Sequence, residues 1–186
     1  MMRRALTLLS ALAATPAHAV EEPKFQQLAQ WGACELRAYP ELVVAETTVA
    51  AERGAAGSSG FRRLAGYIFG GNASAEKIAM TAPVLETPAG DGWTIRFTMP
   101  EGHTLATLPK PDDAKVNMQV VPPTKLAVIR FSGWASDADF ADKTRELMSC
   151  LAAHGLTAAG PAALAQYNPP WTLGPWRRNE VMVEVR

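Results

Sequence analysis

The side chains most capable of chemistry are few and widely spaced. After position 19 the chain has two histidines, His103 and His154, and two cysteines, Cys34 and Cys150. None of them stands at the spacing of a catalytic or zinc site, since G-x-S-x-G, H-E-x-x-H, C-x-x-C and glycine-rich phosphate-loop motifs are all missing from the sequence. The two histidines are expected at the surface, in a connector and at a helix end. The sequence therefore favours a binding protein over an enzyme.

Whether the two cysteines form a disulfide depends on the redox state of the compartment. In an oxidising compartment an even number of cysteines permits one disulfide, which would join Cys34 at the start of a strand to Cys150 on a helix. The spacing of the two cysteines in the sequence does not show whether their sulfur atoms lie close together. The alternative is that both are small buried side chains without a bond between them. Both interpretations stay open on the sequence.

The first 19 residues have the pattern of a secretory signal peptide. Arg3 and Arg4 form a basic n-region, residues 5–14 form a short apolar core, and residues 17–19 form an A-x-A cleavage site. The core is too short for a membrane span, and no second apolar stretch follows. We expect secretion, to a bacterial periplasm in the first instance. The remaining residues 20–186 have the length of a single domain.

The charge balance excludes one class of partner. Removal of Arg3 and Arg4 leaves 16 basic residues of the original 18, against 18 acidic ones. Neither a basic excess nor a run of alternating aromatic and basic residues is present to follow a phosphate backbone. We expect no nucleic-acid partner, no membrane span and a monomeric protein.

The clearest structural pattern lies in residues 61–84. Apolar side chains recur there at i, i+3, i+4 and i+7, which predicts one face of a helix: Phe61, Leu64, Ala65 and Ile68. Ser58 or Ser59 is expected to cap this helix, and a Gly-Gly-Asn turn at 70–72 to end it. Residues 78–84 then alternate as a strand does, with Pro83 placing it at an edge or at its end.

The rest of the chain is read from alternation and turn residues. Residues 20–30 are expected to form a loose leader with a helical turn at 25–28, and residues 86–91 a turn. Strands are expected at 35–39, 42–50, 93–99, 116–120, 126–131, 165–168 and 181–185. Two hairpins are predicted, through Pro40-Glu41 and Pro122-Pro123, and a second helix from Ser136 to Gly155 with Asp139 completing the cap.

The pattern therefore restarts after a connector at 100–114. Each half reads as a β-hairpin, a helix and two further strands, and two such halves could close one sheet on itself without exposed edges. The predicted fold class is α+β.

Two separated motifs carry a resemblance to a known family. The helix, glycine turn and K-I-A-M-T-A-P-V run ending at Val84, followed much later by Y-N-P-P at 167–170 and R-N-E at 178–180, resemble the SOUL haem-binding protein family. The resemblance implies one domain over 20–186, folded as a pseudo-twofold twisted antiparallel β-barrel with two flanking helices. It also implies a tetrapyrrole bound in a shallow apolar cleft between the first helix and the loop between the last two strands.

The resemblance places the ligand-binding residues on two walls. The helix offers Arg62, Arg63, Leu64, Tyr67 and Ile68, and the facing loop offers Tyr167, Trp171, Leu173, Trp176 and Arg177. Aromatic faces can stack on a planar ring, and guanidinium groups can pair with its carboxylates. These are the materials that a haem site needs.

One feature of some family members is missing. Ala38 stands where these members carry a histidine proposed as axial ligand, so we assign no metal ligand. We therefore expect coordination of the iron to add little to the affinity for a porphyrin. The alternatives are a carrier for another amphipathic planar or lipid-like ligand in the same cleft, or an envelope accessory enzyme that processes haem.

Overall fold

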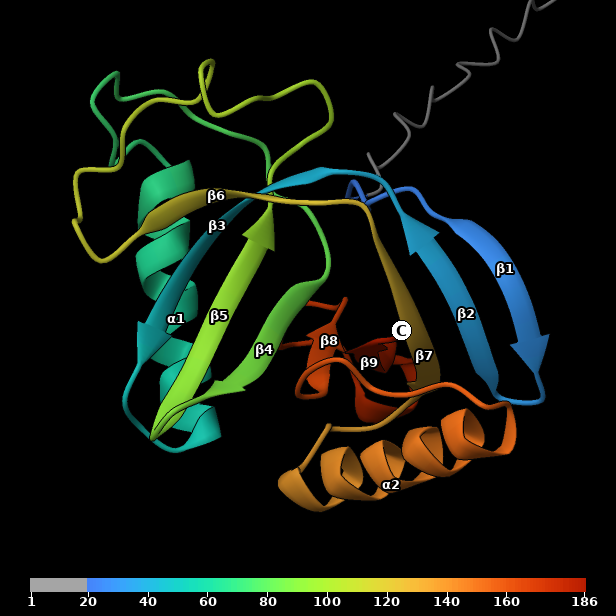
Figure 1. The fold of residues 1–186 in the computed structure, drawn as a ribbon. Helices are drawn as coiled ribbons and strands as arrows, with labels where there is room; N and C mark the ends of the chain where they lie inside the picture. The colour runs from blue at the N-terminus through green and yellow to red at the C-terminus, as the bar shows by residue number, and fades with distance from the viewer. Residues whose placement is uncertain (1–19) are drawn as a thin grey trace, which may run out of the picture.

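The computed structural model describes residues 20–186, so the predicted signal peptide at 1–19 lies outside the described residues and stays a prediction. The described chain has an α+β fold, in which two helices pack on a nine-stranded antiparallel sheet (Figure 1). The elements are β1 (Gln26–Trp31), β2 (Cys34–Tyr39), β3 (Leu42–Val49), α1 (Arg53–Ile68), β4 (Val84–Ala89), β5 (Gly92–Thr98), β6 (Asn117–Val121), β7 (Thr124–Phe131), α2 (Asp137–Ala153), β8 (Ala163–Gln166), a 3-10 turn (Gly174–Trp176) and β9 (Asn179–Glu184). None of the helices in this part of the chain is long and apolar enough to cross a membrane.

The sheet has a twofold arrangement of strands, although its repeating group is not the predicted hairpin, helix and two strands. Its order is β1-β2-β7-β9-β8-β4-β5-β3-β6, so the group β2-β7-β9-β8 repeats the group β6-β3-β5-β4 in the opposite direction. One helix follows the second strand of each group, α2 after β7 and α1 after β3. The sheet is open and ends at β1 and β6, so closure into a barrel is not confirmed. Alternation predicts that a strand has an apolar face, whereas closure depends on twist and stagger, which alternation does not specify.

Both predicted hairpins are wrong. β2 pairs with β1 and β7, while β3 pairs with β5 and β6, and β6 does not pair with β7. The short connections at Pro40-Glu41 and Pro122-Pro123 instead cross from one half of the molecule to the other (Figure 1). Proline fixes only its own φ, but it biases the preceding residue toward extended conformations, which is compatible with a chain that runs on between the two halves.

Helix α1 begins earlier than predicted. Its N-cap is Glu52, without a side-chain hydrogen bond, and the expected caps Ser58 and Ser59 lie inside it. Glycines occur in this first part because the helix lies very close to the sheet: a Cβ on Gly60 would come within 2.3 Å of the Ile95 side chain. Tertiary packing thus overrides the low helix propensity of a Gly- and Ser-rich stretch.

The strand predicted at 78–84 and the turn predicted at 86–91 are both wrong. The strand β4 starts only at Val84 and covers most of the predicted turn 86–91, while the residues before it are irregular. Their backbone hydrogen bonds go elsewhere, from Ile78 to the Ile68 carbonyl oxygen and from Ala82 to the Glu21 carbonyl oxygen, each at 2.8 Å. The expected loose leader contains strand β1 instead, whose glutamines give no apolar alternation to detect.

Helix α2 confirms its prediction closely. Ser136 accepts a hydrogen bond from the Asp139 backbone, and the Asp139 carboxylate accepts from the Ser136 backbone, which completes the capping box. Leu147 and Leu151 are buried on its sheet-facing side. On the same side the structure pairs Cys150 with Cys34 of β2 as a disulfide, with a Cα–Cα distance of 6.8 Å.

Candidate functional site

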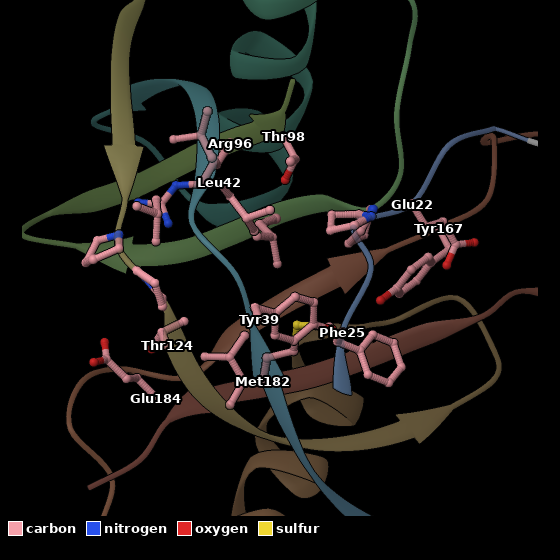
Figure 2. A pocket seen from close by; sticks show the side chains of 18 residues that line it. Glu22, Phe25, Tyr39, Leu42, Arg96, Thr98, Thr124, Tyr167, Met182 and Glu184 are labelled. Atoms are coloured by element: carbon pink, nitrogen blue, oxygen red, sulfur yellow. The ribbon is translucent and has the colours of Figure 1, made fainter. Parts of the chain in front are cut away.

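A groove lies between the two halves, on the sheet face opposite the helices. Successive side chains of a strand point to opposite faces of the sheet, and two strands show this. Ala45 of β3 and Ile95 of β5 pack with α1 residues, while their neighbours Val44 and Arg96 line the groove. Figure 2 shows the side chains that line this groove. The cavity has a volume of about 200 Å³. It is lined by Glu22, Pro23, Phe25, Tyr39, Leu42, Val44, Pro83, Leu85, Arg96, Thr98, Val121, Pro122, Pro123, Thr124, Leu126, Tyr167, Met182 and Glu184.

A buried ionic network lies next to the groove and contacts two of its lining residues, Tyr39 and Tyr167. The Arg37 guanidinium donates to both carboxylate oxygens of Glu180, at 2.8 and 3.2 Å, and to Glu35 at 2.8 Å. Arg37 and Glu180 are only 4% and 3% exposed. The hydroxyl of Tyr167 donates to Glu180 at 2.7 Å. Opposite charges and hydrogen bonds together compensate the burial of these ions.

The N-terminal segment covers this network. The ring of Phe25 lies 4.4 Å from the Arg37 guanidinium and 5.3 Å from the ring of Tyr39, centroid to centroid. Glu22, three residues earlier, forms an ion pair with Arg178, whose guanidinium stacks on Tyr167 at 3.4 Å. The segment that was expected to be a loose leader therefore forms part of the groove wall.

The predicted helix wall of the cleft is mostly core. Leu64, Tyr67 and Ile68 are at most 2% exposed and pack against the sheet. Arg63 pairs with Asp113 at 3.2 Å and hydrogen-bonds Thr47. Arg62 is exposed, so it is the one predicted helix residue that presents a charge freely to solvent. The i, i+3, i+4 spacing that predicted the helix already indicated a buried face for the apolar members.

The predicted loop wall is exposed at the surface. Trp171, Leu173 and Trp176 are 81%, 56% and 74% exposed, between β8 and β9. Trp134, just before α2, is 63% exposed and was missed by the sequence reasoning. It belongs with this loop because a Cβ on Gly174 would lie 2.8 Å from its indole nitrogen. We call these four side chains, Trp134, Trp171, Leu173 and Trp176, the tryptophan surface.

Arginine side chains border the tryptophan surface. The Arg177 guanidinium stacks on the Trp134 ring at 4.3 Å and donates to the carbonyl oxygens of Thr172 and Pro170. Arg53, in the first turn of α1, donates to the carbonyl oxygen of Ala135 at 2.8 Å. The start of α1 and the β8–β9 loop therefore contact the same short segment, whereas the predicted residue Tyr167 lies in the groove instead.

Comparison with known proteins agrees with the two sequence motifs. The family model described as SOUL heme-binding protein matches residues 20–184, nearly all of the described chain. The chain belongs to the SOUL family. No curated protein matches it by sequence.

Solved structures share the fold of this SOUL family member at low identity. The C-terminal domain of EcmrR has a TM-score of 0.63 at 10% identity, over 87% of this chain and 98% of that one. A hydrolase from Listeria innocua has a TM-score of 0.57 at 15% identity, over 86% and 94%. An uncharacterized conserved protein from Listeria innocua has the same TM-score at 13% identity, over 82% and 92%. At such identities these likenesses concern the fold alone.

Residues 20–186 contain no cluster of His, Cys, Asp and Glu side chains that could hold a metal ion. His154 is the C-cap of α2 and stacks on Trp31 at 4.2 Å. Trp134 precedes the 17-residue helix that His154 ends, so the two are about 25 Å apart along its axis. This histidine is therefore too far away to coordinate a metal at the tryptophan surface.

The three tyrosines of this SOUL family member give a test of the groove and core. Burial raises the pKa of Tyr39, Tyr67 and Tyr167, and the carboxylate of Glu180 raises that of Tyr167 further. Above about pH 10 the unfolded chain loses phenolic protons that the folded chain keeps, so the free energy of unfolding is undiminished below that pH and falls above it. We expect tyrosinate absorbance to rise together with unfolding measured by circular dichroism. Titration of a tyrosine near pH 10 in the folded protein would contradict this.

Proposed function

We propose that this protein binds haem or a related tetrapyrrole, without catalysing a reaction, and that the ring lies on the tryptophan surface. Membership of the SOUL family supports tetrapyrrole binding in general. The observation that supports this location is the exposure of three indoles within one short region of surface. Soluble proteins rarely leave so much aromatic area in water without a partner for it.

Size favours the tryptophan surface over the groove. Ligand pockets usually measure about 300–1,000 Å³, and the groove holds only about 200 Å³. A tetrapyrrole would have to separate the two halves to enter it. An open surface sets no such limit, and indole faces stack well on a large planar ring.

Charged groups at the rim fit the propionates of such a ligand. Arg177 already holds its loop through two carbonyl oxygens, which leaves part of its guanidinium to pair with a carboxylate. Arg62 is an exposed cation nine residues beyond Arg53 on α1, about 14 Å along the helix axis, so it would attract an anionic ligand from a distance; it is the helix residue that we retain from the predicted cleft. Binding would then combine apolar burial, stacking and ion pairing.

The aromatic contribution can be tested by titration. Trp171→Ala and Trp176→Ala should each weaken binding of hemin by about tenfold or more, because stacking and apolar burial are lost. Quenching of tryptophan fluorescence and the Soret band measure the affinity. Phe69→Ala is the matched control, since Phe69 is also 62% exposed but lies at the end of α1, and it should bind as the wild type does. Equal affinity in all four proteins would refute the site.

Removal of iron tests the mode of binding. We assign no axial ligand, so protoporphyrin IX should bind within about tenfold of hemin, which is about 1.4 kcal/mol. His103→Ala and His154→Ala should leave both affinities unchanged. A low-spin hemin spectrum that either histidine change abolishes would contradict iron-independent binding.

The compartment proposal rests on separate features. We propose that cleavage after Ala19 releases the protein into the periplasm, and a Cys34–Cys150 disulfide fits an oxidising compartment. If neither porphyrin binds, another amphipathic planar or lipid-like ligand of the tryptophan surface becomes the next candidate. An accessory enzyme is disfavoured because, among the described residues, the one serine hydroxyl that hydrogen-bonds a carboxylate is that of Ser136 with Asp139, and this pair serves as the capping box of α2.

A further inference from the structure

We propose that the groove is a second ligand site, distinct from the tryptophan surface, for a small planar uncharged molecule that carries a carbonyl oxygen. Four features support it: the apolar walls, the compensated charges, the volume and an unused hydrogen-bond donor. It does not depend on tetrapyrrole binding.

The walls of the groove are aliphatic, proline and aromatic. Val128, Ala165 and Met182 are at most 4% exposed and form a small core beneath it, on which Leu85, Leu126 and Tyr167 pack. Prolines at 23, 83, 122 and 123 contribute rigid surfaces without backbone donors. Figure 2 shows that strands from both halves and the N-terminal segment surround the space. Such a lining favours an apolar body in the ligand.

The charges at the groove are largely compensated within the protein. Arg37 pairs with Glu180, and Glu22 with Arg178. Arg96 donates through Nε and one terminal nitrogen to the same Glu46 oxygen, at 2.9 and 2.7 Å. An ionic ligand would lose its hydration without gaining an unpaired partner in the interior, so an uncharged ligand is favoured. The one lining carboxylate without an ion-pair partner among residues 20–186 is that of Glu184, which is exposed.

An unused donor gives the ligand its polar requirement. Tyr39 is 7% exposed, and its hydroxyl oxygen accepts from Arg37 at 3.4 Å, yet within the described chain its own proton has no acceptor. Thr124 is its direct partner across the β2–β7 ladder, and the Thr124 hydroxyl oxygen is buried without a hydrogen-bond partner. A rotation about χ1 of Thr124 exchanges its methyl and hydroxyl groups. Buried polar groups are normally paired, so the hydroxyls of two lining residues without acceptors call for an acceptor on the ligand.

The volume and the aromatic side chains define the ligand class further. About 200 Å³ corresponds to roughly seven water molecules at their share of liquid volume, which admits one or two fused rings and excludes a tetrapyrrole. Phe25, Tyr39 and Tyr167 supply ring faces and edges against which a flat molecule packs. Aromatic ketones and quinones combine a flat apolar body with a neutral acceptor.

The experiment uses a pair of probes on residues 20–186. The fluorescent naphthyl ketone prodan should bind with a blue-shifted emission, and the analogue in which a methylene replaces its carbonyl should bind more weakly. Tyr39→Phe removes a hydroxyl group and Thr124→Val replaces one with a methyl group. The double variant should lose about tenfold in affinity for the ketone while keeping that for the analogue. Thr124→Val alone conserves shape in a β-strand, so it serves if Tyr39→Phe fails to fold.

Binding to the tryptophan surface is the main competing outcome. The Trp171→Ala/Trp176→Ala double variant should bind prodan unchanged while it loses hemin, which separates the two sites. Three results would overturn the proposal: no binding because the groove holds water only, equal affinity for ketone and analogue in the wild type, or loss of prodan binding in the tryptophan variant.

Discussion

The Arg37→Met variant is expected to lose about 3–5 kcal/mol of unfolding free energy, because it leaves a carboxylate buried without its countercharge. Glu180 is 3% exposed, and Arg37 is the cation with which it pairs. The Tyr167 hydroxyl would still donate to Glu180, but one neutral hydrogen bond does not replace an ion pair with two bonds. Urea denaturation, followed by circular dichroism, measures the loss.

A double variant separates the pair from the rest of the site. Arg37→Met/Glu180→Gln removes both charges and keeps an amide oxygen to accept from Tyr167, so it should be more stable than Arg37→Met alone. Arg145→Met is the control, because the Arg145–Asp142 pair has side chains 74% and 65% exposed. Exposed pairs contribute little, so this change should be nearly neutral. A double variant less stable than the single one would contradict the expected role of the buried charge.

The sequence predicts well those elements whose signals are local. The capping box of Ser136 and Asp139 needs only four consecutive residues, and α2 forms where it predicts. The alternation of Ile95 and Phe97 similarly locates β5, because it depends on one strand facing one core. The helix-turn motif and the Y-N-P-P run were sufficient to indicate the family.

The parts that could not be predicted depend on distant contacts. The exchange of β2 and β6 between the halves is decided by which strands are available to pair, which turn residues do not reveal. The glycines at the start of α1 predict a connector from the sequence. In the structure, Gly57 lies against Glu86 and Gly60 against Ile95, which leaves no room for a side chain at either position. Each of these requires a neighbour about 30 residues or more away in the chain, so local propensity is a weak guide.

The same distinction explains the outcome for the candidate site. Trp171 and Trp176 belong to one short loop, so the sequence could name them together; both are exposed, and their role in binding stays a prediction. The groove was not foreseen because its walls come from separate segments, from Glu22 to Glu184, that the strand exchange brings together. No window of the sequence contains enough of it to produce a pattern.

The oxidised protein is expected to be about 2–4 kcal/mol more stable than the reduced protein, because the disulfide closes a long loop in the unfolded chain. Cys34 and Cys150 are 116 residues apart in the sequence, so the unfolded ensemble loses much freedom when they are joined. Denaturation with and without a reductant measures the difference. Counting thiols under denaturing, non-reducing conditions should find none in the exported protein.

The disulfide also bears on the groove, because Cys34 begins the strand that carries Arg37 and Tyr39. It holds β2 to α2 on one face of the sheet, while on the other face Tyr39 lines the groove and Arg37 hydrogen-bonds the Tyr39 hydroxyl. The control is the Cys34→Ala/Cys150→Ala variant. Its free energy of unfolding should equal that of the reduced protein and should not change when reductant is added. Two free thiols in exported protein, or a wild type whose stability does not change with reductant, would contradict the disulfide.

If the disulfide restrains β2, reduction should also weaken prodan binding more than hemin binding, because the tryptophan surface includes no residue of that strand.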